Sequence, residues 1–171
     1  MSIGIDAVTA RRRIPSVSAS TPRIRITKRI GHRWDDLFNL VLDVESYPAF
    51  VPHCRQVRLL SRRAESSTST VIVSRMTVGL AALEVSYANR TKGDAVTRII
   101  EVEAIDGPLR YLRVVWQFNS DGDDRTEIDF SVDFEFSNPI LAAVASRVFS
   151  SMFGEMVDAF ERRADRLFGR Q

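Results

Sequence analysis

The sequence has few of the residues on which disulfides, metal sites and covalent catalysis depend. A single cysteine, Cys54, excludes a disulfide within the chain of 171 residues. The two histidines, His32 and His53, lack the further Cys/His cluster that would complete a zinc site. Glycine-rich phosphate loops and nucleophile-elbow motifs are absent. The sequence therefore offers no convincing catalytic constellation and favours a binding protein over an enzyme.

Acidic residues are scarce at the start of the chain, whereas they outnumber basic residues in the rest of it. The formal net charge is +2, from 24 basic and 22 acidic residues. Residues 1–33 contain eight basic residues and one acidic residue, whereas the remaining 138 residues contain sixteen basic and twenty-one acidic residues. Because nucleic-acid binding relies on basic groups that neutralise phosphates, the acidic body argues against DNA as a partner and makes RNA a poor one.

Residues 1–21 show no sustained periodicity and are rich in Ser, Thr, Ala and Pro. We expect a disordered basic tail, in which Arg11, Arg12 and Arg13 suit attraction to anionic lipid headgroups. A solvated arm and an organellar transit peptide are the alternatives. No apolar run anywhere in the chain approaches the roughly 18 residues that cross a bilayer.

From residue 23 onward, apolar residues recur with the periods of strands and helices. Ile24, Ile26 and Ile30 alternate with arginines and predict a half-buried strand, in which Lys28 is the one exception. A short helix is expected to open at about residue 33, followed by a short second turn of helix at residues 47–51. Six further strands are expected at residues 57–62, 70–78, 83–88, 96–105, 112–118 and 127–136, with turns at residues 64–69, 92–94, 106–108 and 121–123.

Acidic residues occupy the outer face of the last of these strands, whose inner face is aromatic and aliphatic. Asp129 and Asp133 lie two steps apart on that outer face. We expect them to pair with cross-strand arginines such as Arg98 or Arg113 rather than to act as a general acid and base.

A long helix is expected at the end of the chain. Asn138 and Pro139 are typical of a helix start, and Gly169 is the expected stop after Leu167 or Phe168. Apolar side chains cover about half of the helix circumference, more than the roughly 100° stripe of a helix that rests on one sheet. Three explanations stay open: contacts with the early helices, a partner or membrane, and a cavity beneath the helix.

Together these elements predict an α+β fold in which helices cover one face of an antiparallel sheet of about seven strands. Because a single long helix cannot cover a curved sheet at core density, we expect space between the helix and the sheet. Large apolar side chains on both surfaces would line it and suit a hydrophobic ligand, namely Met76, Trp116, Phe118, Phe134, Phe149, Met152 and Phe153. The alternative is that these side chains are simply core.

Six short segments, in order along the chain, resemble one known family. Residues 44–54, Val-Glu-Ser-Tyr-Pro-Ala-Phe-Val-Pro-His-Cys, resemble the D-V-x-x-Y-x-x-F-V-P-W-C segment of the ubiquinone-binding START-like proteins. Further similar segments lie at residues 76–79, 107–109, 116–118, 132–136 and 159–164. These coenzyme Q-binding proteins, whose bacterial members are often labelled ribosome association toxin RatA, belong to the polyketide cyclase/dehydratase superfamily.

The resemblance implies a helix-grip fold over residues 22–169, with two short helices after the first strand and a sheet wrapped on the long C-terminal helix. It implies ubiquinone or a related polyisoprenoid quinone bound beneath that helix, without a catalytic cofactor, in support of respiratory electron transport or quinone biosynthesis. It adds Phe50, Val51, His53 and Val78 to the candidate lining residues, and Met156 on the apolar half of the long helix is a further candidate. His53 replaces the family's usual tryptophan, so either it offers the ligand a hydrogen bond instead or the ligand differs.

Two alternative functions come from the same resemblance. One is a ribosome-associated factor that interferes with subunit association. The other is a polyketide cyclase or dehydratase, which would need polar groups that converge inside the cavity. A quinone-binding protein is expected in the bacterial cytoplasm, peripheral to the inner membrane, or at the mitochondrial inner membrane of a eukaryote.

Overall fold

The computed structural model describes residues 23–80 and 83–169, so the tail expected at residues 1–21 lies outside the described residues. The described elements follow the predicted order of one strand, two short helical segments, six strands and a long helix. They are β1 (Arg23–Ile30), α1 (Trp34–Leu42), the 3-10 helix η1 (Val44–Ala49), β2 (Cys54–Ala64), β3 (Ser69–Leu80), β4 (Leu83–Asp94), β5 (Ile99–Asp106), β6 (Leu109–Ser120), β7 (Thr126–Phe136) and α2 (Pro139–Phe168).

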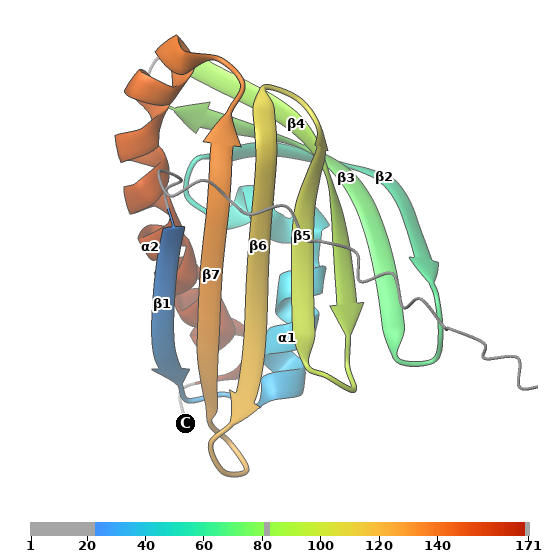
Figure 1. Ribbon diagram of the computed structural model, residues 1–171. Coiled ribbons are helices and arrows are strands. Elements are labelled where there is room, and N and C mark those ends of the chain that lie inside the picture. Colours follow the sequence, from blue (N-terminus) through green and yellow to red (C-terminus); the bar gives the residue numbers. More distant parts are fainter. Residues whose placement is uncertain (1–22, 81–82, 170–171) are drawn as a thin grey trace, which may run out of the picture.

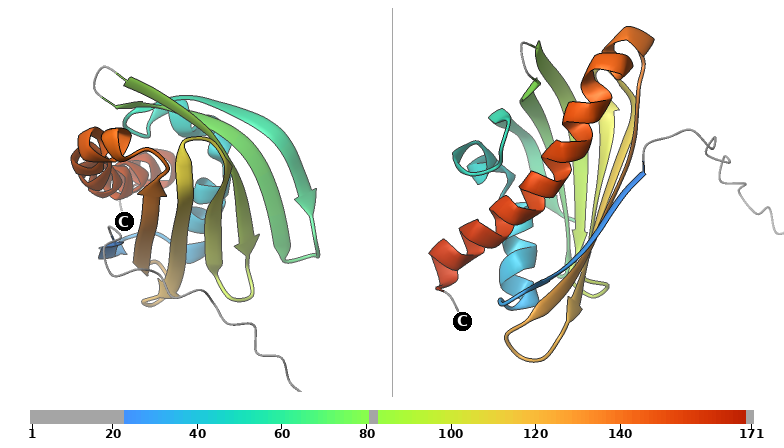
Figure 2. Two further views of the ribbon diagram at one scale, coloured as in Figure 1. Left: turned by 45° about the horizontal axis from the view of Figure 1, so that its top comes forward. Right: turned by 90° about the vertical axis from the view of Figure 1, so that its left-hand side faces the viewer.

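The seven strands form one antiparallel sheet in the order β1-β7-β6-β5-β4-β3-β2 (Figure 1). Strands β2 to β7 are neighbours both in sequence and in space, whereas β1 pairs with β7 at the far edge. The segment that contains α1 and η1 leads from one edge of the sheet to the other, and it crosses the face that α2 also covers (Figure 2). The sheet curves around these helices, which confirms the predicted α+β helix-grip fold.

Helix α2 begins and ends where its sequence predicted. Asn138 Oδ1 accepts hydrogen bonds from the backbone N–H of Ile140 at 2.8 Å and of Leu141 at 3.4 Å. Pro139 occupies the first turn, where its missing N–H leaves no helical hydrogen bond unmade. Gly169 follows the last helical residue with a φ of 82°, a conformation that favours glycine.

The turn predicted at residues 92–94 was wrong. Those residues belong to β4, and the turn occupies residues 95–98, so β5 begins later than predicted. Gly93 has another role, because a Cβ there would lie 2.9 Å from Leu42 Cδ2 and 3.2 Å from Phe38 Cζ. Glycine within a strand often marks such a close approach rather than a turn. Here it lets α1 lie directly on the sheet.

The two arginines named as partners of Asp129 and Asp133 were wrong, although Asp133 does pair with a cross-strand arginine and both carboxylates make surface contacts as expected. Arg113 faces Asp133 across the β6–β7 ladder, but its guanidinium binds Glu101 at 2.7 Å. Arg98 lies over an aromatic ring of α1. The carboxylates instead bind β1, which the strand order places beside β7; the bonds are Arg23 Nε to Asp133 Oδ1 at 2.8 Å and Thr27 Oγ1 to Asp129 Oδ1 at 2.7 Å.

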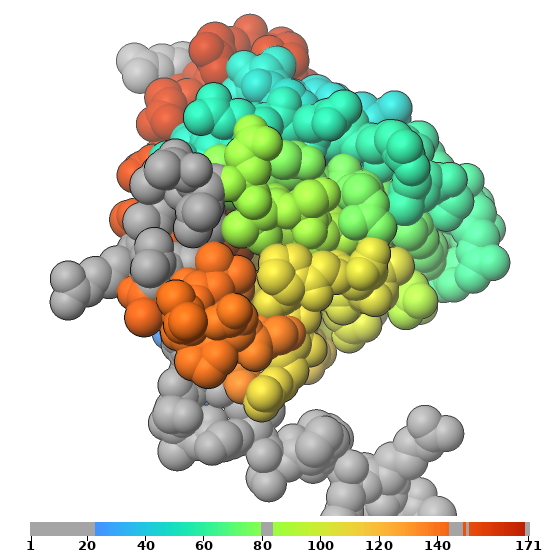
Figure 3. Space-filling view, turned by 90° about the horizontal axis from the view of Figure 1, so that it is seen from above, coloured from blue at the N-terminus to red at the C-terminus, as the bar shows by residue number. Residues whose placement is uncertain are grey.

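The β5–β6 turn, predicted at residues 106–108, lies directly against β4. Gly107 has a φ of 119°, and a Cβ there would lie 2.6 Å from the Cβ of Tyr87. The same turn bonds the segment before α2, because the Pro108 carbonyl accepts from the Ser137 N–H at 2.9 Å. Figure 3 shows this end of the molecule, with the yellow turn between the green β3–β4 strands and the orange start of α2. The turn thus holds Tyr87 in place.

Gly107→Ala is expected to lower the free energy of unfolding by more than about 2 kcal/mol, because the strain of a positive φ adds to the clash with Tyr87. Gly122→Ala is the matched control, since Gly122 has a φ of 94° but nothing lies within 4 Å of a Cβ built there. Urea denaturation measures both variants. Equal losses would show that the contact with Tyr87 is unimportant.

Candidate ligand-binding interior

The two halves of the sheet's inner face differ in how closely the helices cover them. On β6 and β7 the inward aromatic side chains are almost fully buried, with exposed fractions of 0–5%: Trp116, Phe118, Phe130, Phe134 and Phe136. On β2 to β5 several inward apolar side chains pack against the core but stay partly exposed: Val57, Leu59, Met76, Val102 and Ala104. Apart from Ile24 and Ile26 on the edge strand β1, the accessible apolar part of the inner face therefore lies on β2 to β5.

Aromatic rings hold α2 on β6 and β7. The ring centroids of Phe149 and Phe134 lie 5.0 Å apart, and those of Phe160 and Trp116 lie 5.2 Å apart. Phe153 adds a further contact with Phe134 at 6.1 Å. The helix contacts β1 and β7 on this side and reaches β3 on the other. It thus spans the concave face while its ring contacts stay on one half.

The predicted lining residues divide between these two halves. Trp116, Phe118, Phe134, Phe149 and Phe153 belong to the closely packed aromatic part of the core. Val51, Val78 and Met152 are buried as well. Phe50, Met76 and Met156 are partly buried and pack against the core, so they retain the accessible surface that a ligand needs. Contact with a ligand remains a prediction for all of these residues.

His53 lies at the rim rather than in the core. Its φ of 63° falls in the left-handed region, and its carbonyl accepts from the Gly79 N–H at 2.8 Å. The imidazole is about one third exposed, and its Nε2 lies 3.5 Å from Glu155 Oε2 on α2. His53 therefore links the start of β2 to α2 at the edge of the interior, and its hydrogen bond to a ligand remains a prediction.

A row of polar side chains lies on the inner face of β3 and β4, where apolar residues were expected. We call Ser74, Tyr87, Asn89 and Thr91 the polar row; all four are 6% exposed or less. Ser74 Oγ donates to Asn89 Oδ1 at 3.0 Å, and the Tyr87 hydroxyl donates to Met76 Sδ at 3.4 Å. Sequence reasoning missed this row because it ended the strand before Asn89. The signal that could have revealed the row is the alternation of inward and outward residues, which continues past Tyr87 to Thr91.

Burial raises the pKa of three groups inside, Tyr47, Cys54 and Tyr87, which their ordinary pKa values already leave protonated at neutral pH. Burial raises the pKa of the Cys54 thiol to about 11. Burial, with a smaller contribution from nearby Cys54, raises the pKa of Tyr47 and of Tyr87 well above the usual range. The Tyr47 hydroxyl already donates to the Val41 carbonyl. These groups therefore act as hydrogen-bond donors rather than as bases.

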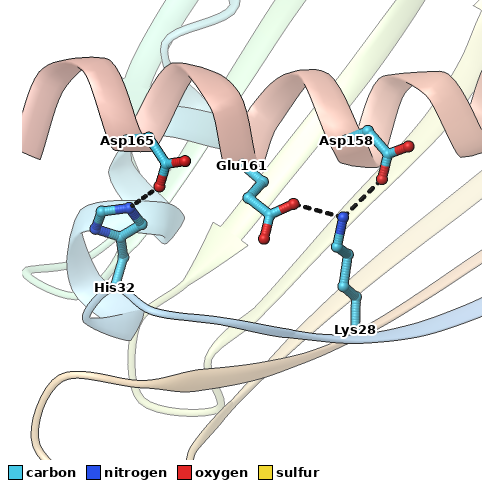
Figure 4. A network of polar contacts seen from close by, with 5 residues as sticks. All are labelled: Lys28, His32, Asp158, Glu161 and Asp165. Atoms are coloured by element: carbon cyan, nitrogen blue, oxygen red, sulfur yellow. Dashed lines mark hydrogen bonds and ion pairs between the residues drawn. The ribbon is translucent and has the colours of Figure 1, made fainter. Parts of the chain in front are cut away.

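Ion pairs fasten the β1 edge of the sheet to α2 (Figure 4). Lys28, the exception in the β1 pattern, places its Nζ 2.6 Å from Asp158 Oδ1 and 2.5 Å from Glu161 Oε2. Burial disfavours the charged amine, but hydrogen bonds to both carboxylates outweigh it and raise the pKa of Lys28. Nearby, the buried His32 places Nε2 2.9 Å from Asp165 Oδ1. These contacts hold α2 against the β1 edge of the sheet, which is the edge opposite to the accessible half.

A curved antiparallel sheet that grips a long C-terminal helix over a partly accessible inner face defines a START-like helix-grip domain. The chain belongs to the polyketide cyclase / dehydrase and lipid transport family, whose model matches residues 30–161. Among the described residues, no helix is both long enough and apolar enough to cross a membrane.

Two relatives and one solved structure illustrate this membership. Ribosome association toxin RatA of Escherichia coli K12 is 30% identical over 147 residues, which cover 86% of this chain and 89% of RatA. The mitochondrial coenzyme Q-binding protein COQ10 homolog B of Xenopus laevis is 31% identical over 151 residues, which cover 85% of this chain and 59% of that protein. The solution structure of the 18 kDa protein CC1736 from Caulobacter crescentus has a TM-score of 0.70 and 31% identity, and covers 86% of this chain and 99% of that one. The predicted family is confirmed.

The raised pKa of Cys54 predicts a loss of stability in alkali. The folded state keeps the thiol protonated to about pH 11, whereas the unfolded chain loses this proton near the ordinary pKa of 9.0. The contribution is therefore fully present below pH 9 and is lost as the pH rises toward 11. Urea denaturation measures the free energy of unfolding across this pH interval. We expect it to fall by roughly 1–2 kcal/mol less in Cys54→Ala than in wild type. Parallel pH profiles for the two proteins would contradict this assignment.

Proposed function

We propose that this protein binds ubiquinone or a related polyisoprenoid quinone, without catalysing a reaction on it, between α2 and the β2–β5 half of the sheet. The observation that carries the proposal is the apolar inner surface that stays accessible there. A prenyl tail gains about 25 cal/mol for each Å² of apolar surface removed from water, so such a surface suits it. The name of the Xenopus relative, a coenzyme Q-binding protein, supports a quinone as the ligand.

The side chains at this surface suit a long, flexible tail. Met76 on β3 and Met156 on α2 are both partly buried, and methionine adapts its shape to irregular apolar ligands. Phe50 is partly buried as well, and its ring meets Phe160 of α2 at 5.0 Å. Met76, Met156 and Phe50 thus offer apolar contacts beside α2, and the two methionines can adapt to prenyl tails of different length.

The ionisable groups inside favour binding over catalysis. Tyr47, Cys54 and Tyr87 hold their protons at neutral pH, so none of them is poised to take a proton from a substrate. Neither named relative, a toxin and a coenzyme Q-binding protein, bears the name of an enzyme. We infer that the protein supports respiratory electron transport or quinone biosynthesis by holding the quinone, and not a cyclase or dehydratase reaction.

A quinone ligand also implies a place of action. Prenylated quinones partition into bilayers, so we infer that the protein exchanges its ligand from the cytoplasm at the surface of the membrane that contains the quinone. Arg11, Arg12 and Arg13 supply basic charge that anionic headgroups attract. These arginines lie outside the described residues, and composition alone supports their role.

Quinone binding is tested by incubating the protein with quinone-loaded vesicles, followed by native mass spectrometry and organic extraction. We expect the extract to contain a redox-active quinone. Ala104→Phe places a large side chain on the accessible inner face and should lower the bound quinone by about tenfold or more. Val115→Phe, on the outer face of β6, is the matched control and should bind as wild type does.

Two outcomes would count against the proposal. Wild-type protein that takes up no quinone, from vesicles or during expression, would contradict the function. Equal binding by Ala104→Phe and wild type would contradict the placement of the ligand. Thermal unfolding shows whether both variants are folded.

A second candidate function, association with the ribosome, is favoured by the distribution of charge on the outer face. Residues 54–93 carry seven basic and two acidic residues, whereas residues 94–169 carry eight basic and fifteen acidic residues. Outward side chains of β2, β3 and β4 gather into what we call the basic outer patch: Arg58, Arg63, Arg75, Arg90 and Lys92. Among the described residues, Arg58 and Arg90 have no ion-pair partner, while the other three pair with Glu65 or Asp106.

The basic outer patch refines the argument from overall charge. Phosphate contacts depend on the local potential, and a local group of arginines attracts RNA even on a protein whose body is acidic. The name of the Escherichia coli relative, a ribosome association toxin, supports this candidate.

Co-sedimentation with ribosomal subunits in moderate salt tests this second function. If the basic outer patch binds ribosomal RNA, Arg58→Glu combined with Arg90→Glu should abolish sedimentation. Arg162→Glu combined with Arg166→Glu, on exposed positions of α2, changes the net charge equally and is the control. Sedimentation that survives in the first double variant would rule out this surface, and a wild-type protein that stays in the supernatant would rule out the function.

A further inference from the structure

Two members of the polar row, Tyr87 and Asn89, have strong hydrogen-bond donors that lack good acceptors among the described residues. Asn89 Oδ1 accepts from Ser74, which leaves the side-chain NH₂ group without a hydrogen-bond partner among the described residues. The Tyr87 hydroxyl donates to the thioether of Met76, which is a weak acceptor. Unlike the hydroxyl of Tyr111, Asn89 Nδ2 is not a fully buried atom without a partner, so a ligand in the interior can reach it. Acceptor oxygens on a ligand would therefore meet two donors that the protein itself does not satisfy.

These donors lie on the half of the inner face that remains accessible. The register places Asn89 opposite Ala104 of β5, a small and partly buried residue that leaves room beside the amide. Met76, which accepts from Tyr87, is also partly buried. Gly107 packs against the Cα and Cβ of Tyr87 and fixes the position of that residue. The donors are thus held in place next to the surface on which we propose that the prenyl tail lies.

The two donors face the same interior from one strand. Tyr87 and Asn89 are both inward residues of β4, and the Cα atoms of residues two apart on a strand lie about 7 Å from each other. The phenol of Tyr87 is carried on a longer side chain than the amide of Asn89, so the two donors are offered at different depths of the interior. A ring with carbonyl groups on opposite sides can accept from one donor at each of its oxygens.

We propose that Tyr87 and Asn89 bind the two carbonyl oxygens of the quinone head group, and that the site prefers the oxidised quinone to the quinol. This inference rests on the proposed function and names the polar end of the same site. The quinone has acceptors only, which matches the donors of Tyr87 and Asn89. The hydroxyl groups of the quinol bring two more donors to a place where Ser74 already takes one of the two lone pairs of Asn89 Oδ1 and where the other nearby acceptor, Met76 Sδ, is weak. Leaving a buried donor unpaired costs about tenfold in affinity.

The test compares three probes: a ubiquinone with two isoprene units, its quinol, and squalene, an isoprenoid hydrocarbon without oxygen. Wild type should bind the quinone about tenfold more tightly than the quinol. Tyr87→Phe and Asn89→Leu should each weaken quinone binding by about tenfold and reduce the preference for the oxidised form, while squalene binding stays unchanged. Tyr111→Phe removes a hydroxyl from the outer side of β6 and is the matched control.

Infrared spectroscopy provides a second measurement that does not depend on binding affinities. Hydrogen bonds should shift the carbonyl stretching band of the bound quinone to lower frequency in wild type, and the shift should shrink in each variant that folds. An unshifted band in wild type, equal affinity for quinone and quinol, or variants that bind the quinone as wild type does would each overturn this inference and leave the proposed function standing. A wild-type protein that binds squalene but no quinone would instead overturn the proposed function.

Discussion

Ring-to-ring packing between α2 and the β6–β7 half of the sheet is the contact on which the rest of the structure depends. Phe149, Phe153 and Phe160 fasten the helix to that half. The ion pairs of Lys28 and the hydrogen bond between His32 and Asp165 fasten the helix to β1 and the residues that follow it, at the same edge. A helix is only about 10–12 Å wide, so a helix anchored there cannot also fill the concave space against β2 to β5. The accessible inner surface follows from the position of the anchor.

The chemistry of that surface differs from the chemistry of the anchor. The β6–β7 half is aromatic and closely packed, whereas β3 and β4 place Ser74, Tyr87 and Asn89 among partly exposed apolar residues. An interior of this kind can hold a ligand that is apolar along its length and polar at one end. Because the ionisable groups inside hold their protons, the polar end offers hydrogen bonds rather than proton transfer. The proposed quinone has this division between head and tail.

Basic and acidic residues are also unevenly distributed along the chain. The whole-chain balance of +2 conceals a basic stretch over β2 to β4 and an acidic remainder from β5 to α2. The basic stretch can be counted in the sequence, but a net charge summed over residues 34–171 conceals it. Strand pairing then brings residues as distant as Arg58 and Arg90 onto one outer face. The basic outer patch and the accessible apolar part of the inner face therefore occupy opposite faces of the same strands.

The sequence by itself determined the features that depend on neighbouring residues. The alternation in β7, the start of α2 at Asn138 and its end at Gly169 are set by the strand period and by helix capping, and they predicted the helix-grip fold. Only the tertiary structure decided which residues meet across the sheet. It paired Asp129 and Asp133 with β1, made Gly93 the place where α1 approaches, and joined Ser74 to Asn89. These contacts depend on strand order and register, which periodicity within a single strand does not specify.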